Sequence, residues 1–156
     1  MAWTQETINE LYAAVVSPCK QIGAFRSSVL QHEPKSAPAA LPALALWWSG
    51  IGPARGVSGL NATAARVEFR WRAYMNFKST PEDKIDPLLT TVVSQLFGIF
   101  TGAFTLGGEV MEVDLLGAYG EPLSATAGYI AQDGQEFRVA EGVIPLICDG
   151  LWVQVA

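Results

Sequence analysis

Charged residues are scarce in this sequence. Only 16% of its 156 residues are charged and 50% are hydrophobic, whereas about 25% are charged in a typical soluble domain. No uninterrupted apolar run is long enough to cross a membrane, because Pro42, Gly50, Gly98 and Gly102 break the longest candidates. The start has no basic segment followed by an apolar one, so we expect no signal peptide. We therefore expect part of the apolar surface to be buried between subunits.

Side chains that carry chemistry are also few. The single histidine, His32, lies in a polar, proline-punctuated stretch, and Cys19 and Cys148 match no zinc or redox spacing. The carboxylates at residues 82–86 sit at an expected helix start, where they complement the helix dipole. We expect two buried thiols, a solvated histidine, and no catalytic, cofactor or metal site. The net charge of −5 argues against binding nucleic acid by neutralising phosphates.

The strongest pattern lies in residues 65–77, where apolar and polar residues alternate. A strand turns successive side chains to opposite faces, so this pattern predicts a long strand with one face in a core. The apolar positions are Ala65, Val67, Phe69, Trp71, Ala73, Met75 and Phe77. The other face carries a dense charge row for an acidic protein, namely Arg66, Glu68, Arg70 and Arg72. This row is either a solvated sheet face, a subunit interface or, less favoured, a surface that contacts DNA in a channel.

Two amphipathic helices are predicted on either side of this strand. Residues 4–17 have apolar positions at helical spacing, with Thr4 as the N-cap and Pro18 ending the helix. The sequence Thr80-Pro81-Glu82-Asp83 predicts a helical turn. A main helix is then expected from Pro87 to about Thr101, with an apolar stripe for the core.

The remaining segments read as strands and connections. Residues 41–49 are apolar on both faces, as in a central strand, with Trp47 and Trp48 pointing to opposite sides. The glycine-rich residues 51–64 predict a long mobile loop. Two Asp-Gly pairs, Asp133-Gly134 and Asp149-Gly150, each predict a hairpin. The expected fold is a single α+β domain: a mostly antiparallel curved sheet, an N-terminal helix and one long central helix packed on one face, and an extra C-terminal hairpin.

The order of these elements resembles the tail terminator proteins of long-tailed bacteriophages, the lambda-type family. The segments that carry the resemblance are Leu41–Trp47, the strand at Arg66–Phe77 with the Pro81-Glu82-Asp83 helix start, and the closing strand at Leu151–Ala156. Residues 109–148 hold more strand than that pattern needs.

The resemblance implies a structural virion protein with no enzymatic activity. It implies a ring, usually of six copies, that caps the tail tube in the host cytoplasm and offers a joint to the head–tail connector, with DNA passing through unbound. Arg66, Glu68, Arg70 and Arg72 would then face a neighbouring subunit or the channel. The loop would contact the tube protein through Arg55, Val57, Leu60 and Asn61.

Two other functions remain open from the sequence. One is a head–tail joining protein or a tube protein of the same virion. The other is a small-molecule-binding α+β domain, whose pocket would be lined by the aromatic residues Trp47, Trp71, Tyr74 and Tyr129.

Overall fold

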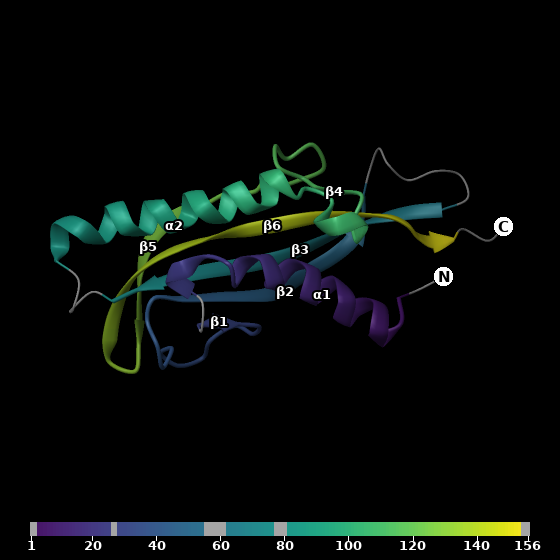
Figure 1. The fold of residues 1–156 in the computed structure, drawn as a ribbon. Helices are drawn as coiled ribbons and strands as arrows, with labels where there is room; N and C mark the ends of the chain where they lie inside the picture. The colour runs from purple at the N-terminus through teal and green to yellow at the C-terminus, as the bar shows by residue number, and fades with distance from the viewer. Residues whose placement is uncertain (1–2, 26–27, 55–61, 77–80, 154–156) are drawn as a thin grey trace.

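A computed structural model describes residues 3–25, 28–54, 62–76 and 81–153. It shows an α+β fold, as predicted, in which two helices accompany a mixed sheet of six strands (Figure 1). In chain order the elements are α1 (Gln5–Cys19), β1 (Val29–Leu30), β2 (Ala43–Pro53), β3 (Ala62–Met75), α2 (Glu82–Gly102), β4 (Glu112–Val113), β5 (Thr126–Gln132) and β6 (Gln135–Val153), with short 3₁₀ turns at Gly23–Phe25 and Leu106–Gly108. The strand order is β1-β2-β3-β6-β4, and β5 also pairs with β6. Among these strands only β1 and β2 pair in parallel.

The central strand β3 carries the core on one face. All of its odd-numbered residues from Ala65 to Met75 are buried, as the alternation predicted. The ring of Tyr12 in α1 meets Phe69 edge-on, with 5.1 Å between the ring centroids, and Phe97 in α2 meets Trp71 edge-on at 6.2 Å. Each such contact stabilises by roughly 0.5–1.5 kcal/mol beyond its buried area. Both helices are therefore positioned by neighbouring aromatic residues of one strand.

The N-terminal helix begins as predicted and ends slightly later. The side chain of Thr4 accepts a hydrogen bond from the backbone N–H of Thr7 at 3.2 Å, so Thr4 is the N-cap. Pro18 does not end the helix but lies in its last turn, since α1 continues to Cys19. A proline this close to the end removes only one intrahelical hydrogen bond.

The long helix is one unit rather than a turn followed by a helix. α2 begins at Glu82 and runs through Pro87, whose missing N–H removes one helix hydrogen bond, to the carbonyl of Asp83, without ending the helix. The predicted cap, Thr80, lies outside the described residues. The helix buries one apolar stripe, as predicted, and its buried side chains are Ile85, Leu89, Val92, Leu96 and Phe100.

α2 is also longer than the sequence predicted, because glycines that were expected to interrupt the apolar segment lie within the helix. It continues through Gly98 to Gly102, and its 21 residues would suffice, by length and composition alone, to cross a membrane. Here its buried stripe packs in the same core as α1 and β3. Core helices of soluble proteins pass the same length and composition criterion.

One of the two predicted hairpins is confirmed and the other is wrong. Asp133 and Gly134 have φ of 52° and 73° and join β5 to β6, with Gln132 paired to Gln135. Asp149-Gly150 makes no hairpin, because β6 runs straight through it to Val153. There the register against β3 shifts, so that these residues form a bulge. The Asp-Gly pair does not turn the chain here because β3 extends back to Ala62 and pairs with the end of β6.

The predicted loop at 51–64 is shorter than expected. Ile51 to Pro53 belong to β2, and residues 62–64 belong to β3, so these two strands form a long ribbon. Within β2, Ser49 is an extra residue: Trp48 pairs with Phe69, whereas Gly50 pairs with Glu68. Such a bulge changes which face the following side chains occupy.

Substitution of Gly142 tests the packing of β6 against the segment that leads into β5. A Cβ atom on Gly142 would lie 1.7 Å from the carbonyl oxygen of Ser124, so the backbone would have to move. We expect Gly142→Ala to lower the free energy of unfolding by about 2 kcal/mol or more, measured by urea denaturation. The matched control is Gly98→Ala in α2, where a Cβ meets nothing within 4 Å and helix propensity favours alanine by about 1 kcal/mol. Equal effects of the two substitutions would contradict this packing.

Candidate functional site

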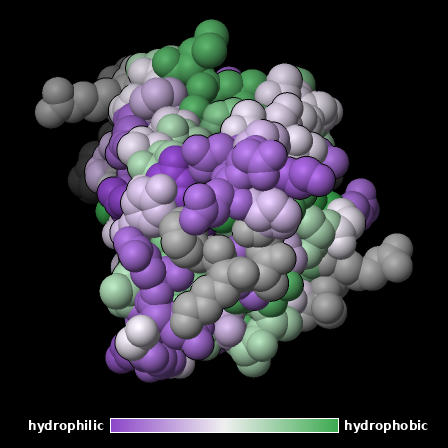
Figure 2. Space-filling model, turned by 90° about the vertical axis from the view of Figure 1, so that its left-hand side faces the viewer, coloured by the Kyte–Doolittle hydropathy of each residue, from purple (hydrophilic) through white to green (hydrophobic). Residues whose placement is uncertain are grey.

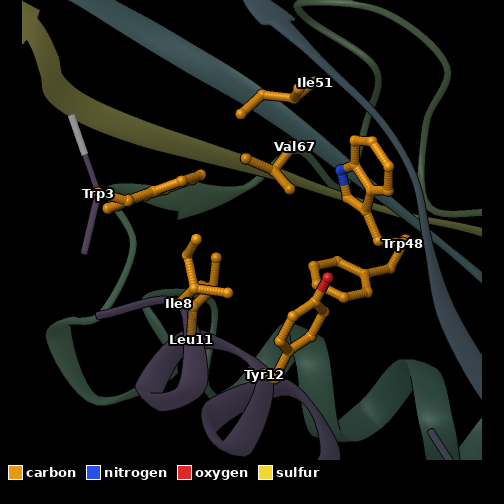
Figure 3. Close-up of a pocket in the computed structure, with 8 residues that line it drawn as sticks. Trp3, Ile8, Leu11, Tyr12, Trp48, Ile51 and Val67 are labelled. Carbon is orange, nitrogen blue, oxygen red and sulfur yellow. The ribbon is translucent and has the colours of Figure 1, made fainter. Parts of the chain in front are cut away.

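An apolar groove opens between α1 and the second half of β2 (Figure 3). Residues from three elements line it: Trp3, Ile8, Leu11 and Tyr12 from α1 and the residues before it, Trp48 and Ile51 from β2, and Val67 and Phe69 from β3. Figure 3 shows these side chains directed toward a common space. Trp48 is 50% exposed and Ile51 is 43% exposed, which is unusual for such large apolar groups. The groove therefore offers uncovered aromatic and aliphatic surface at one place.

The bulge at Ser49 creates this apolar surface. In a regular strand, Trp48 and Ile51 are an odd number of residues apart and would point to opposite faces. With one residue extra, Trp48 pairs with Phe69 and Ile51 with Val67, so both lie on the face that carries the core. The hydroxyl of Ser49 donates to the backbone oxygen of Glu68 at 3.1 Å and holds the bulge in place.

The size of the groove limits what it can hold. Its volume is about 160 Å³, close to that of an apolar cavity that accommodates benzene, about 150 Å³. Pockets for drug-sized ligands are larger, at about 300–1,000 Å³. The groove therefore fits one ring or one large side chain.

Sequence reasoning missed this groove. Ile51 falls in the stretch assigned to a loop, and Trp3 and Ile8 are separated from β2 by more than 30 positions in the printed sequence. The available signal was Trp48, an aromatic residue at the end of an apolar strand that needed a second surface. The surface beside which Trp48 lies becomes clear only from the position of α1 in the fold.

The four charged residues predicted on the other face of β3 differ in their surroundings. Arg66 pairs with Glu68 at 2.8 Å and also donates to the backbone oxygen of Glu121 at 2.8 Å. The loop carrying Gly120 packs directly on the Arg66 side chain. Arg66 is thus held on a part of the face that a loop covers.

Arg72 is buried, so the expectation of a fully wet face is wrong here. It pairs with Glu141 at 2.5 Å, donates to the hydroxyl of Tyr74 at 3.0 Å and lies over the ring of Trp47 at 5.4 Å. Burial disfavours its charge, but the hydrogen bonds to Tyr74 and Glu141 outweigh this and raise the pKa of Arg72. A second small core surrounds it: Ala43, Ala45, Tyr74, Phe137 and Val139, with Leu30, Ala37 and Leu41 packed against them.

Arg70 is the residue of the charged row whose side chain is exposed and makes no ion pair in the described structure. It is exposed, and no ion pair or hydrogen bond of Arg70 occurs within the described ranges. Its neighbours across the sheet are Trp47 on one side and buried Val143 on the other. Along β3 and β6 this face carries three arginines and two glutamates, Glu68 and Glu141, and both glutamates are already paired. Glu112 of β4 lies on the same face, since it pairs with Ile147, the neighbour of Arg66. The charge of Arg70, which has no partner within the described ranges, is therefore available to another molecule.

The predicted tube-contacting residues and the predicted aromatic pocket have different outcomes. Arg55, Val57, Leu60 and Asn61 lie outside the described residues. The expected aromatic pocket does not form. Its four members do not share one pocket: Trp71 is fully buried in the main core, Tyr74 and Trp47 belong to the second core, and Tyr129 is 58% exposed on β5.

The two ends of the molecule differ in character. The groove lies at the end where α1 begins, and the opposite end carries the start of α2 and the β5–β6 turn (Figure 1). Figure 2 views that opposite end and shows hydrophilic groups gathered in a band across it. There Arg138 pairs with Asp86 at 2.9 Å and lies over the ring of Tyr129 at 4.5 Å, which ties α2 to the hairpin.

The titratable groups that could perform chemistry are dispersed. In the described part of the chain, no group of three His, Cys, Asp or Glu side chains is placed to hold a metal ion. His32 is exposed, and Asp114 is buried and accepts hydrogen bonds from the backbone N–H groups of Ala118 and Tyr119. Asp114 therefore has a role in shaping its loop.

No protein-family model matches this sequence, and no curated protein is detectably similar to it. The features on which a function can be argued are those of the chain itself. They are the apolar groove between α1 and β2 and the unpaired charge of Arg70 on the opposite face of the sheet.

The two cysteines are buried thiols, as predicted, and their reactivity tests the packing of the core. Burial raises the pKa of Cys19 from 9.0 to about 12 and that of Cys148 from 9.0 to about 11. The thiolate is the reactive form, so we expect both to resist a thiol reagent at pH 8 until urea unfolds the chain. Since both pKa values are raised on folding, stability is fully present below pH 9 and falls as the pH rises through 9 to 12. Rapid labelling of the native protein would contradict this burial.

Proposed function

We propose that this chain is a structural subunit of a long-tailed bacteriophage virion, a tail terminator. In this proposal the copies assemble into a ring, expected to hold six, that caps the tail tube and provides the joint to the head–tail connector. DNA passes through the ring without specific binding. A head–tail joining protein or a tube protein of the same virion would use the same kind of self-association.

The observation that carries the proposal is the uncovered groove. Trp3, Trp48 and Ile51 form an apolar surface on a single copy of a chain that has few charges. Surfaces of this composition are covered in protein–protein interfaces, where aromatic residues are enriched. A closed ring covers such a surface on every copy.

The element order adds support through the resemblance to the terminator family. An N-terminal helix, an apolar strand, a long alternating strand and a long helix follow one another as in that pattern. The net charge of −5 suits a channel through which DNA must slide, because a negative wall does not hold phosphates.

Reversal of the charge at Arg70 tests whether this face contributes to assembly. We expect Arg70→Glu to leave the fold unchanged, because Arg70 is exposed and has no partner in the described structure. Across an interface, two like charges placed opposite each other cost several kcal/mol, so the ring should be lost at concentrations where the parent chain forms it. The measurement is light scattering after size-exclusion chromatography, with and without tail-tube protein.

The matched control is Lys84→Glu, the same charge reversal on the exposed start of α2. It should assemble like the parent chain, and Arg70→Lys should retain most of the assembly. If Arg70→Glu assembles normally, this face is solvated in the ring. A parent chain that stays monomeric even with tail-tube protein would overturn the proposed function itself.

A second function is favoured by the size and lining of the groove. An apolar cavity of about 160 Å³ could hold a single aromatic ring of a small ligand. If so, indole-sized compounds should quench tryptophan emission of a monomer saturably, and Trp48→Ala should weaken the effect at least about tenfold. In the ring proposal, assembly itself should shield Trp48 from an aqueous quencher, and such compounds should not bind the assembled form.

A further inference from the structure

We propose that the copies join edge to edge, with β2 of one copy pairing with β5 of the next to form a continuous sheet around the ring. This inference rests on the proposed self-association and names the surface that performs it. The two edges lie on opposite sides of the sheet in every copy. Each copy would therefore offer one edge to each neighbour.

The outer edge of β2 is largely unpaired by other strands. β1 covers it only at Leu44 and Ala45, which leaves residues 46–53 without a strand neighbour on that side in the described structure. This stretch, Leu-Trp-Trp-Ser-Gly-Ile-Gly-Pro, contains no charged residue. Proteins protect long edges with charges, prolines or bulges. This edge has no charge, its proline is the last residue, and the bulge at Ser49 divides it into two short stretches that can pair with another strand.

The outer edge of β5 is the second such stretch. β5 pairs with β6 along one side, and the described chain places no strand along the other. Its seven residues, Thr-Ala-Gly-Tyr-Ile-Ala-Gln, are also uncharged. They are mostly small, so a neighbouring backbone can approach closely. The two edges are similar in length, at seven and eight residues.

Strand direction and side-chain faces are compatible between the two edges. β2 and β6 both run antiparallel to β3, and β5 runs antiparallel to β6, so β5 runs opposite to β2. A second copy placed beside the first in the same orientation therefore pairs antiparallel, the more stable arrangement. It also keeps the helix-bearing faces on the same side of the extended sheet.

This pairing would cover the groove. Trp48 and Ile51 lie on the helix-bearing face of β2, and Tyr129 lies on the same face of β5, because its partner across the ladder, Arg138, is opposite core residue Met75 of β3. Tyr129 is the largest side chain that β5 would bring to this position, and its ring matches the space for one ring. Because the two edges differ, the contact is head-to-tail, and such contacts generate rings when the rotation closes.

Cross-linking of two single-cysteine variants tests the pairing. Gly50→Cys places a thiol on β2 at a position where a Cβ atom meets nothing within 4 Å. Thr126→Cys or Gln132→Cys places one near either end of β5, so that both extreme registers are sampled. The native thiols are buried and serve as an unreactive background. One variant is labelled with ¹⁵N, the pair is mixed in the presence of tail-tube protein, and a short bis-maleimide is added. Mass spectrometry then separates products of unlike variants from products of like ones.

The proposal expects cross-links between unlike variants, at least about tenfold above those of the control Lys84→Cys, which lies on α2. It also expects Ala127→Lys on β5 to abolish assembly, while Leu116→Lys, at a residue 94% exposed and outside both edges, assembles normally. Cross-links between two Gly50→Cys copies would show two-fold β2–β2 pairing and overturn it. A ring without β2–β5 cross-links that tolerates Ala127→Lys overturns the interface and leaves the proposed function standing. Absence of any assembly overturns both.

Discussion

The constraint on which the rest of this structure depends is the alternation of side chains along β3. One face of this strand holds the main core, and both helices are positioned by aromatic contacts with its adjacent odd-numbered residues, Phe69 and Trp71. The other face holds the charged row. A slip of one residue would exchange the two faces and place arginines under the helices, so the register of the whole sheet is fixed by this strand.

The same strand explains why the two faces differ in what they can offer a partner. On the helix-bearing face, α1 leaves the end of β2 uncovered, and the exposed groups are apolar. On the opposite face, loops and the β5–β6 hairpin close both ends and most charges find partners within the chain. The first face can contribute buried area to an interface. The second can contribute specificity through Arg70, since rim charges mainly select and orient partners.

Much of this fold follows from local patterns in the sequence. The capped start of α1, the apolar stripe of α2, the alternation of β3 and the Asp133-Gly134 hairpin all depend on residues close together in the chain, so periodicity and turn chemistry predict them. The failures involve distant segments. Asp149-Gly150 has the same turn chemistry but forms a bulge, because residues near Ala62 supply a partner strand.

The candidate site was predicted less well for the same reason. Arg72 and Tyr74 occupy polar-face positions of an alternating strand, and only the distant segments around Leu41 and Phe137 make that part of the face a core. The groove likewise requires α1 to lie beside β2. The sequence indicated that Trp48, as a large apolar residue, must lie against some surface, but the position of that surface depends on long-range packing.

The bulge at Ser49 means that the groove is encoded by a count of residues as much as by their chemistry. Regular pairing of the same residues, without the bulge, would keep every aromatic and aliphatic side chain in the sequence, yet it would turn Ile51 to the charged face and bring Gly50 and Gly52 to the groove. Among descendants of this chain, point substitutions could therefore adjust the groove gradually. The groove therefore needs the bulge for as long as the chain keeps Ser49, whereas deletion of Ser49 would leave Trp48 and Ile51 on the same face of a regular ladder.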